Sequence, residues 1–286
     1  MQDQPLAYMN REFLESDDAR PLRILAEYLE PLRRLKEQNI QDTVVFFGSA
    51  RVHSRVTATR ALDRLKKKRP SRTAEHAALL KRSRKAVEWS RYYEDARELA
   101  TKLTKWSLAL ESPRHRFVVT SGGGPGIMEA ANRGAHEAGG KSIGFNIRLP
   151  FEQGANRYIT SGLHFEFHYF FMRKFWFAYL AKALVIFPGG FGTLDEMFEI
   201  LTLAQTQKLS KQLGVFLYGR EYWEAILDLK PMDEWGAINA ADLDLLKWVD
   251  TPDAAFAQLR DHLMAFHLVP ETAQEEQAPG IAKTRG

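Results

Sequence analysis

Short apolar runs alternate with amphipathic segments along most of this chain, and the alternation predicts its fold. Six runs predict strands, at residues 43–48, 117–120, 141–146, 163–167, 183–187 and 214–218. Between them, apolar residues at helical spacing predict helices at residues 126–138, 168–181, 193–206 and 220–229. Strands that alternate with helices form a parallel sheet covered on both faces. We therefore expect an α/β, Rossmann-like doubly wound fold.

The N-terminal part of the chain is expected to lie outside this sheet. Leucines at helical spacing between Leu22 and Leu35 predict a helical N-terminal extension over residues 1–40. Pro21 can stand at the start of a helix, whereas Pro31 is expected to kink or divide it. The extension should therefore consist of one kinked helix or two shorter ones.

The α/β domain is expected to span residues 41–269. Helical patterns near residues 242–248 and 252–267 should complete it. The remaining stretch, residues 270–286, is polar and is expected to be disordered.

The segment between the first two predicted strands, residues 52–112, is polar and strongly basic. A helical pattern from 73 to 110 follows a break at Pro70, which predicts a helical insertion that enlarges the crossover. Between Arg51 and Arg91 the chain has nine Arg and five Lys against three acidic residues, a net of +11. Because the whole chain carries +4, the remainder carries −7.

Two interpretations of this basic segment stay open. A solvated helical surface is favoured, because the segment has no interleaved aromatic residues on which bases could stack. The alternative is the binding of a nucleic acid or of a polyphosphate such as an alarmone.

The composition indicates the cellular compartment of the protein but not its function. The chain has 286 residues and no cysteine, which excludes disulfides and thiolate catalysis. It shows no start typical of a signal peptide, and no run approaches the roughly 20 apolar residues of a membrane span. We expect a cytoplasmic protein with no membrane contact.

A glycine-rich turn follows the strand predicted at 183–187. Pro188 ends the strand, and Gly189, Gly190 and Gly192 follow. Thr193 is predicted to cap the next helix, with Glu196 three residues later as in a capping box. A strand, a glycine turn and a helix N-terminus together favour the binding of an anion.

A second turn of the same kind lies earlier in the chain. It contains Gly122, Gly123, Gly124 and Gly126, between the strand at 117–120 and its helix. A smaller turn, with Gly48 and Ser49, follows the first strand. Two anion-binding turns in one chain suggest a substrate with a phosphate and a further group beside it.

Several familiar nucleotide and catalytic motifs are absent from the sequence. The dinucleotide fingerprint would need a glycine at Ile127, and a P-loop ending at Ser142 would need one at Ala135. The eight histidines show no metal-ligand spacing, and the nucleophile elbow of the α/β-hydrolases is missing. We therefore predict neither a metal site nor NAD binding nor ATP hydrolysis.

Arg173, Lys174 and Glu196 are the candidate charged residues near these turns. Arg173 and Lys174 stand in an aromatic run, which is more typical of a core or a dimer interface than of a cage for bases. A partly buried arginine in such a place is usually matched to an anion. For Glu196, a capping role is the simpler interpretation on spacing alone, and a catalytic role is the alternative.

Four segments resemble the LOG (Lonely Guy) family, long described as possible lysine decarboxylases. Residues 188–196 match the PGGxGTxxE signature, and Met172 to Lys174 are similar to the family's MxxRK segment. Residues 121–129 resemble its GGGxxGxM loop, and 44–49 its first strand and turn. The resemblance covers residues 43–50 and 117–218. One departure is that Phe170 and Phe171 precede Met172, where the family often has Met-His-x.

The resemblance implies a phosphoribohydrolase that cleaves a nucleoside 5′-monophosphate into free base and ribose 5-phosphate. It implies catalytic roles for Arg173 and Glu196, no metal or organic cofactor, and a homodimer or higher oligomer. A non-catalytic nucleotide or phosphorylated-cofactor binding protein, like the molybdenum-cofactor carriers, is the alternative. The implied phosphate and substrate contacts are Gly48, Ser49, Gly122, Gly123, Gly124, Gly126, Met128, Lys174, Gly189, Gly190, Gly192 and Thr193.

Overall fold

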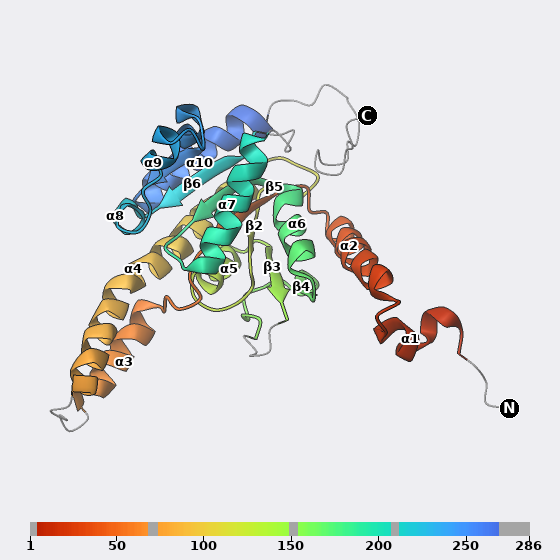
Figure 1. Ribbon diagram of the computed structural model, residues 1–286, viewed down its shortest axis with the longest axis horizontal. Coiled ribbons are helices and arrows are strands. Elements are labelled where there is room, and N and C mark those ends of the chain that lie inside the picture. The colour runs from red at the N-terminus through yellow and green to blue at the C-terminus, as the bar shows by residue number, and fades with distance from the viewer. Residues whose placement is uncertain (1–4, 68–73, 149–153, 207–211, 269–286) are drawn as a thin grey trace.

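A computed structural model describes residues 5–67, 74–148, 154–206 and 212–268 of the chain. Its centre is a seven-stranded sheet in the order β4-β3-β2-β1-β5-β6-β7, in which every neighbouring pair is parallel (Figure 1). The expected α/β doubly wound fold is therefore confirmed. The strands are β1 (Thr43–Phe47), β2 (Val118–Ser121), β3 (Ser142–Ile147), β4 (His164–Phe167), β5 (Ala181–Ile186), β6 (Gly214–Tyr218) and β7 (Leu246–Val249).

Six of these strands lie where the apolar runs predict them, but β7 is a correction. The helix predicted near residues 242–248 is a short 3₁₀ helix, η2 (Ala240–Leu245), followed by β7. Leu246 and Val249 are buried, and the strand pairs with β6, opposite Val215 and Tyr218. A short apolar run does not distinguish helix from strand by itself, and pairing with a neighbouring strand decided the outcome.

Helices cover both faces of the sheet, and each face has its own apolar core. On one face, side chains from α2 (Arg20–Glu37), α6 (Phe170–Leu180) and α7 (Phe191–Gln205) pack around Phe47, Phe145 and Ile186. On the other face, α4 (Ala74–Leu108), α5 (Ile127–Glu137) and α10 (Pro252–His267) pack around Phe46, Val119 and Phe216. Because helices cover both faces, β1, in the middle of the sheet, is buried along its whole length.

The N-terminal extension begins with η1 (Ala7–Met9) and α1 (Arg11–Glu15) and continues into α2. Pro31 was expected to kink or divide the helix, and the division does not occur, because α2 runs from Arg20 to Glu37 as one helix. A proline leaves the carbonyl four residues earlier without its helical donor. Here that carbonyl belongs to Glu27, and it accepts a 2.8 Å hydrogen bond from Trp176 Nε1 of α6. The packing of α2 on α6 therefore compensates for the proline.

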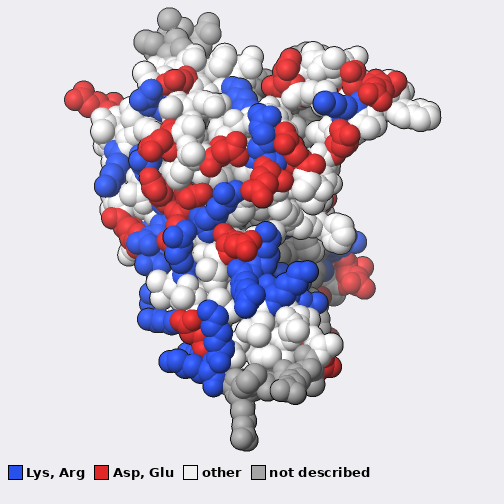
Figure 2. All heavy atoms as spheres, turned by 90° about the vertical axis from the view of Figure 1, so that its left-hand side faces the viewer, with Lys and Arg blue, Asp and Glu red and all other residues white. Residues whose placement is uncertain are grey.

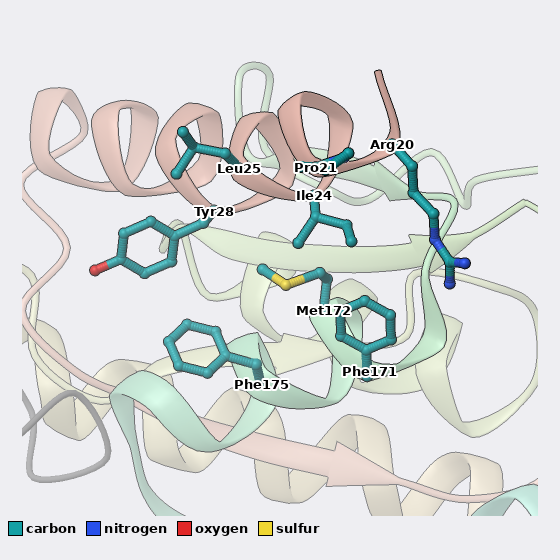
Figure 3. A pocket seen from close by; sticks show the side chains of 8 residues that line it. All are labelled: Arg20, Pro21, Ile24, Leu25, Tyr28, Phe171, Met172 and Phe175. Atoms are coloured by element: carbon teal, nitrogen blue, oxygen red, sulfur yellow. The ribbon is translucent and has the colours of Figure 1, made fainter. Parts of the chain in front are cut away.

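The aromatic run in α6 divides into two parts. Trp176, Phe177 and Tyr179 are buried in the core, as expected for most of the run. Phe171 and Phe175 instead line a hollow of about 800 Å³ between α6 and α2, opposite residues such as Ile24 (Figure 3).

The basic segment forms two helices, α3 (Arg55–Lys67) and the 35-residue α4. The two helices run side by side and project from the sheet on the side opposite to α1 and α2 (Figure 1). They connect β1 to β2, which are adjacent and parallel, so the segment is an enlarged crossover. Near the end of the chain, the helix predicted at 220–229 is shorter, α8 (Arg220–Glu224), and is followed by α9 (Lys230–Glu234).

The tail at residues 270–286 lies outside the described residues. Within the described ranges, no helix is long and apolar enough to cross a membrane.

Candidate functional site

The candidate site lies at the carboxyl ends of the central strands. From β1 the chain builds the sheet outward through β2, β3 and β4, and from β5 it builds outward in the opposite direction. The order therefore reverses between β1 and β5, which is where open α/β sheets bind ligands. The three glycine turns predicted as candidates follow β1, β2 and β5, so the fold gathers them at this point.

Ser49, after β1, joins the other two turns. Its N–H donates to the Pro188 carbonyl at 3.0 Å, and its carbonyl accepts from Ile127 N–H at 3.1 Å. Gly48 beside it needs to lack a side chain, because a Cβ there would lie 2.8 Å from the Ile127 side chain. The backbone at Gly48 and Ser49 thus connects the glycine turn after β2 with the glycine turn after β5.

The turn after β2 leads directly into α5, as predicted. Gly126 adopts a φ of +75°, and a Cβ at this position would lie 2.3 Å from the Ser49 carbonyl oxygen. Gly123 has a φ of +72°, and its Cβ would lie 1.9 Å from Asn146 Oδ1. Met128 lies against Gly122, since a Cβ on Gly122 would come within 2.6 Å of the Met128 sulfur. Only glycine allows the backbone to form a turn this tight.

Asn156 holds this turn in place and was missed by sequence reasoning. Its backbone N–H donates to the Gly123 carbonyl at 2.8 Å. Its side-chain Nδ2 contacts the carbonyls of Gly123 at 3.0 Å and Gly124 at 3.1 Å, and Asn132 Oδ1 at 2.9 Å. Asn156 lies in the irregular stretch before β4, where neither periodicity nor a motif marks it.

The turn after β5 corrects the predicted capping box. α7 begins at Phe191 with Gly190 as its N-cap, so Thr193 lies in the first turn and Glu196 in the second. Thr193 is buried against Gly189, where a Cβ would lie 2.1 Å from Thr193 Oγ1. A Cβ at Gly190 or Gly192 would meet nothing within 4 Å, so the backbone at the start of α7 faces open space.

The early start of α7 leaves backbone donors at the site. The first N–H groups of a helix have no intrahelical acceptor, and Leu194 N–H is the first in α7 to bond back, to Gly190. The N–H groups of residues 191–193 are therefore available at the positive end of the helix dipole. Tyr222 steadies the turn by donating its hydroxyl to the Gly189 carbonyl at 2.7 Å, a contact that sequence reasoning also missed.

Arg173 and Glu196 form a buried ion pair next to this turn. Arg173 lies in the first turn of α6 and Glu196 in the second turn of α7, and Nη2 lies 3.2 Å from Oε1. Each side chain is only 14% exposed. The guanidinium lies near the rings of Phe170 and Phe177, at 5.4 and 5.7 Å from their centroids. Two residues predicted as a catalytic pair from distant motifs are thus in contact.

The pair is not fully satisfied by hydrogen bonds. Arg173 Nε is buried and has no hydrogen-bond partner among the described residues. Burial raises the pKa of Glu196 to about 7, although the attraction of Arg173 opposes this. Burial also lowers the pKa of Arg173, which nevertheless stays charged because a guanidinium does not deprotonate in proteins. A carboxyl group that titrates near neutral pH can both accept and return a proton.

Lys174 takes a different position from its neighbour. Its ammonium contacts Asp195 at 2.8 Å and Glu199 at 2.9 Å, both on α7. These pairs fasten α6 to α7 beside Arg173 and Glu196. A direct role for Lys174 in binding substrate stays a prediction.

The described residues contain no cluster of three or more His, Cys, Asp or Glu side chains that could hold a metal ion. The candidate site itself brings together a carboxyl group, a guanidinium and backbone N–H groups.

Comparison with known proteins finds relatives at modest sequence identity. The family model described as "Possible lysine decarboxylase" matches residues 128–259. An Oryza sativa protein named "Probable cytokinin riboside 5'-monophosphate phosphoribohydrolase LOG4" is 27% identical over 173 residues, which cover 59% of this chain and 73% of that protein. An Arabidopsis thaliana protein of the same description, LOG6, is 26% identical over 172 residues, or 60% of this chain and 81% of that protein.

Solved structures with a similar chain path include two proteins of molybdenum-cofactor handling. The Moco carrier protein of Chlamydomonas reinhardtii is 18% identical with a TM-score of 0.45, covering 79% of this chain and 99% of that one. The molybdenum cofactor binding protein of Rippkaea orientalis is 18% identical with a TM-score of 0.41, covering 59% of this chain and 86% of that one.

Proposed function

The chain is related to the LOG family, as its motifs predict, and on that premise we propose that it hydrolyses a nucleoside 5′-monophosphate. The N-glycosidic bond would be cleaved, giving the free base and ribose 5-phosphate. The observation that carries the proposal is the buried Arg173–Glu196 pair beside the N-terminus of α7. A general base and an anion-binding turn are then within one short stretch of α7.

The phosphate is assigned to the glycine turns. The free N–H groups at residues 191–193 and the turn at residues 122–126 can surround an anion, and Ser49 holds the two turns together. Gly190 and Gly192 leave open space in which a phosphate can approach the backbone. Binding at this end of the substrate would place the sugar toward Glu196, because Thr193 and Glu196 are three residues apart on one helix face.

Glu196 is assigned to the step at the sugar. As the C1′–N bond breaks, its electron pair moves to the base nitrogen and positive charge develops at C1′. The Glu196 carboxylate stabilises that charge and accepts a proton from the water that adds to C1′. The proton then passes to the departing base, so no other reagent is consumed.

Arg173 is assigned to orienting the substrate. Its buried Nε is unsatisfied within the described residues, so a phosphate or ribose oxygen would complete its hydrogen bonding. The guanidinium would also hold the Glu196 carboxylate in position through the contact at 3.2 Å. This arrangement would restrict the motion of both the substrate and the Glu196 carboxylate, which lowers the entropic part of the activation free energy.

The test is a panel of purine and pyrimidine nucleoside 5′-monophosphates, including N6-substituted adenosine monophosphates, each paired with its nucleoside. Release of free base is followed by chromatography. We expect cleavage of at least one monophosphate, with the matching nucleoside cleaved at least about 100-fold more slowly, because remote phosphate binding contributes to the transition state. Equal rates on both members of a pair would contradict the proposal. Tight nucleotide binding with no base released would instead indicate a non-catalytic nucleotide or cofactor-binding protein.

A further inference from the structure

The hairpin of α3 and α4 has an uneven distribution of charge that the proposed hydrolysis does not use. The described residues 55–67 and 74–90, which we call the basic hairpin, contain nine Lys and Arg against three Asp and Glu, a net of +6. The rest of α4, residues 91–108, contains four against three, a net of +1. Figure 2 shows Lys and Arg gathered over the lower part of the molecule, whereas both signs mix above. The charge is therefore concentrated where the helices leave the α/β body.

The two halves of α4 also differ in what their cations contact. In the half that lies on the body, Arg91 pairs with Glu221, Arg97 with Glu137 and Lys102 with Asp253. In the basic hairpin, Lys85 pairs with Glu88, one turn away on the same helix. The other cations of the hairpin form no ion pair with any described residue; they are Arg55, Arg60, Arg64, Lys66, Lys67, Lys81, Arg82 and Arg84.

These unpaired cations are arranged along helix faces. Arg60, Arg64 and Lys67 have the four- and three-residue spacing that aligns side chains along α3, over about 10 Å. On α4, the unpaired Lys81 and Arg84 line a groove of about 690 Å³, together with Ala77, Leu80 and the Lys85–Glu88 pair. Such rows can meet a series of anions at once, whereas a single small anion would need only two or three of these groups.

The uncharged side chains of the hairpin narrow the choice of partner. Val56 and Leu79 are its exposed large apolar residues, and they stand on different helices, so neither helix offers an apolar stripe that could enter a lipid surface. Trp89 packs against Tyr222 at 5.3 Å between ring centroids, so it is not free to stack on a base. Single-stranded nucleic acids are usually held by aromatic stacking, whereas a duplex is held through its phosphates.

We propose that the basic hairpin binds the phosphate backbone of a nucleic-acid duplex, without regard to base sequence. The base of the hairpin lies next to the turn after β5, because Trp89 packs on Tyr222 and Tyr222 donates to the Gly189 carbonyl. The cations between residues 60 and 84 lie farther out along α3 and α4, so a duplex held by them would lie beside the candidate active site and not in it. Duplex binding by the hairpin does not depend on the proposed hydrolysis, and each is tested by its own measurement.

The experiment measures binding of the full-length protein to a fluorescent 20-base-pair duplex by anisotropy, between about 50 and 200 mM salt. The hairpin variant combines Arg60→Gln, Arg64→Gln, Lys81→Gln and Arg84→Gln. A control variant with the same change in net charge combines Arg11→Gln, Arg33→Gln, Lys36→Gln and Arg260→Gln, which lie on other helices. Circular dichroism and the melting temperature establish that both variants are folded.

We expect wild-type protein to bind two duplexes of unrelated sequence equally, with a Kd on the order of 10⁻⁵ M at the lower salt. The hairpin variant should bind at least tenfold more weakly. The slope of its log K against log salt concentration should be smaller in magnitude than that of wild type by about three. The control variant should change Kd by less than about threefold. Hydrolysis of the best nucleotide should stay within about threefold in both variants.

Several results would overturn the proposal. It fails if the hairpin variant binds duplex as well as wild type does, or if the control variant loses as much affinity. It also fails if poly-glutamate or anionic lipid vesicles of equal charge compete as well as unlabelled duplex, because the hairpin would then not discriminate nucleic acid from other polyanions.

Discussion

Two buried arginine–carboxylate pairs lie at opposite ends of the central strands and differ in how completely they are hydrogen-bonded. At the amino ends, Arg116 Nε lies 2.8 Å from Asp42 Oδ2, and the other Asp42 oxygen accepts Phe117 N–H at 2.5 Å. Arg116 also donates to the His267 carbonyl at 2.6 Å. At the carboxyl ends, Arg173 and Glu196 share a single contact at 3.2 Å, and Arg173 Nε has no partner among the described residues.

The difference separates a structural pair from a candidate reactive one. Burial raises the pKa of both carboxyl groups, so burial alone does not distinguish them. What distinguishes them is that Asp42 has a donor for each oxygen, while the Arg173–Glu196 pair has an unused donor beside the glycine turn after β5. A buried polar atom without a partner in a folded protein is a place where a ligand can complete the network.

The largest effect should follow from breaking the structural pair. Arg116→Met leaves the Asp42 carboxylate buried without its countercharge, which typically costs about 3–5 kcal/mol of unfolding free energy. Urea unfolding measures this directly. As a control, Arg33→Met removes an exposed pair with Glu37 and should leave the urea midpoint close to that of wild type. A loss below about 1 kcal/mol for the Arg116 variant would remove the distinction between the two pairs.

Replacing the arginine of the reactive pair should affect rate more than stability. Arg173→Lys keeps the charge but not the planar fork, so substrate orientation should suffer. We expect kcat/KM to fall at least about tenfold, near 1.4 kcal/mol, with a melting temperature within a few degrees of wild type. Steady-state kinetics gives kcat/KM, and calorimetry on the same preparation gives the melting temperature. An unchanged kcat/KM would show that Arg173 only supports the fold.

The pH dependence of the reaction should reflect the raised pKa of Glu196. Its carboxylate is the form that accepts a proton, so kcat/KM should level off above about pH 7 and fall below it, approaching tenfold per pH unit. In Glu196→Gln the residual rate should follow only the substrate phosphate, which titrates near pH 6. A wild-type profile that stays level down to pH 5 would exclude Glu196 as the base.

The smallest effect should come from loosening the turn after β5. Tyr222→Phe removes the hydroxyl that donates to the Gly189 carbonyl at 2.7 Å, at a cost of about 1 kcal/mol. We expect KM to rise by up to about fivefold, with kcat nearly unchanged, because the proposal assigns the turn to phosphate binding and not to bond breaking. A fall in kcat with no change in KM would place Tyr222 in the chemical step.

The sequence predicted the framework of this molecule better than its contacts. Strands such as β1 and β5 were predictable because they are apolar along their whole length, and the glycine turns because their spacing is unusual. The capping box at Thr193 and Glu196 failed because α7 begins two residues earlier, at Phe191, with Gly190 as its N-cap.

The remaining differences depend on residues far away in the chain. Pro31 does not divide α2, because Trp176 supplies the donor that the Glu27 carbonyl needs. Asn156 bonds to the Gly123 carbonyl and Tyr222 to the Gly189 carbonyl, each 33 residues earlier in the chain. No local pattern in the sequence marks either residue. The contact between Arg173 and Glu196 likewise follows from the packing of α6 against α7, although the resemblance of their motifs had brought the two residues together as a functional pair.

The central claim is that the Glu196 carboxylate takes part in breaking the glycosidic bond. The most direct test compares single-turnover rates of wild type, Glu196→Gln and Glu199→Gln on the best nucleoside 5′-monophosphate. Glu199 is the matched control, because it is a carboxylate one turn along the same helix and pairs with Lys174. The account predicts a loss of at least about 100-fold, near 2.7 kcal/mol, for Glu196→Gln with substrate affinity retained, and less than about threefold for Glu199→Gln. A folded Glu196→Gln protein that keeps nearly wild-type turnover would contradict it.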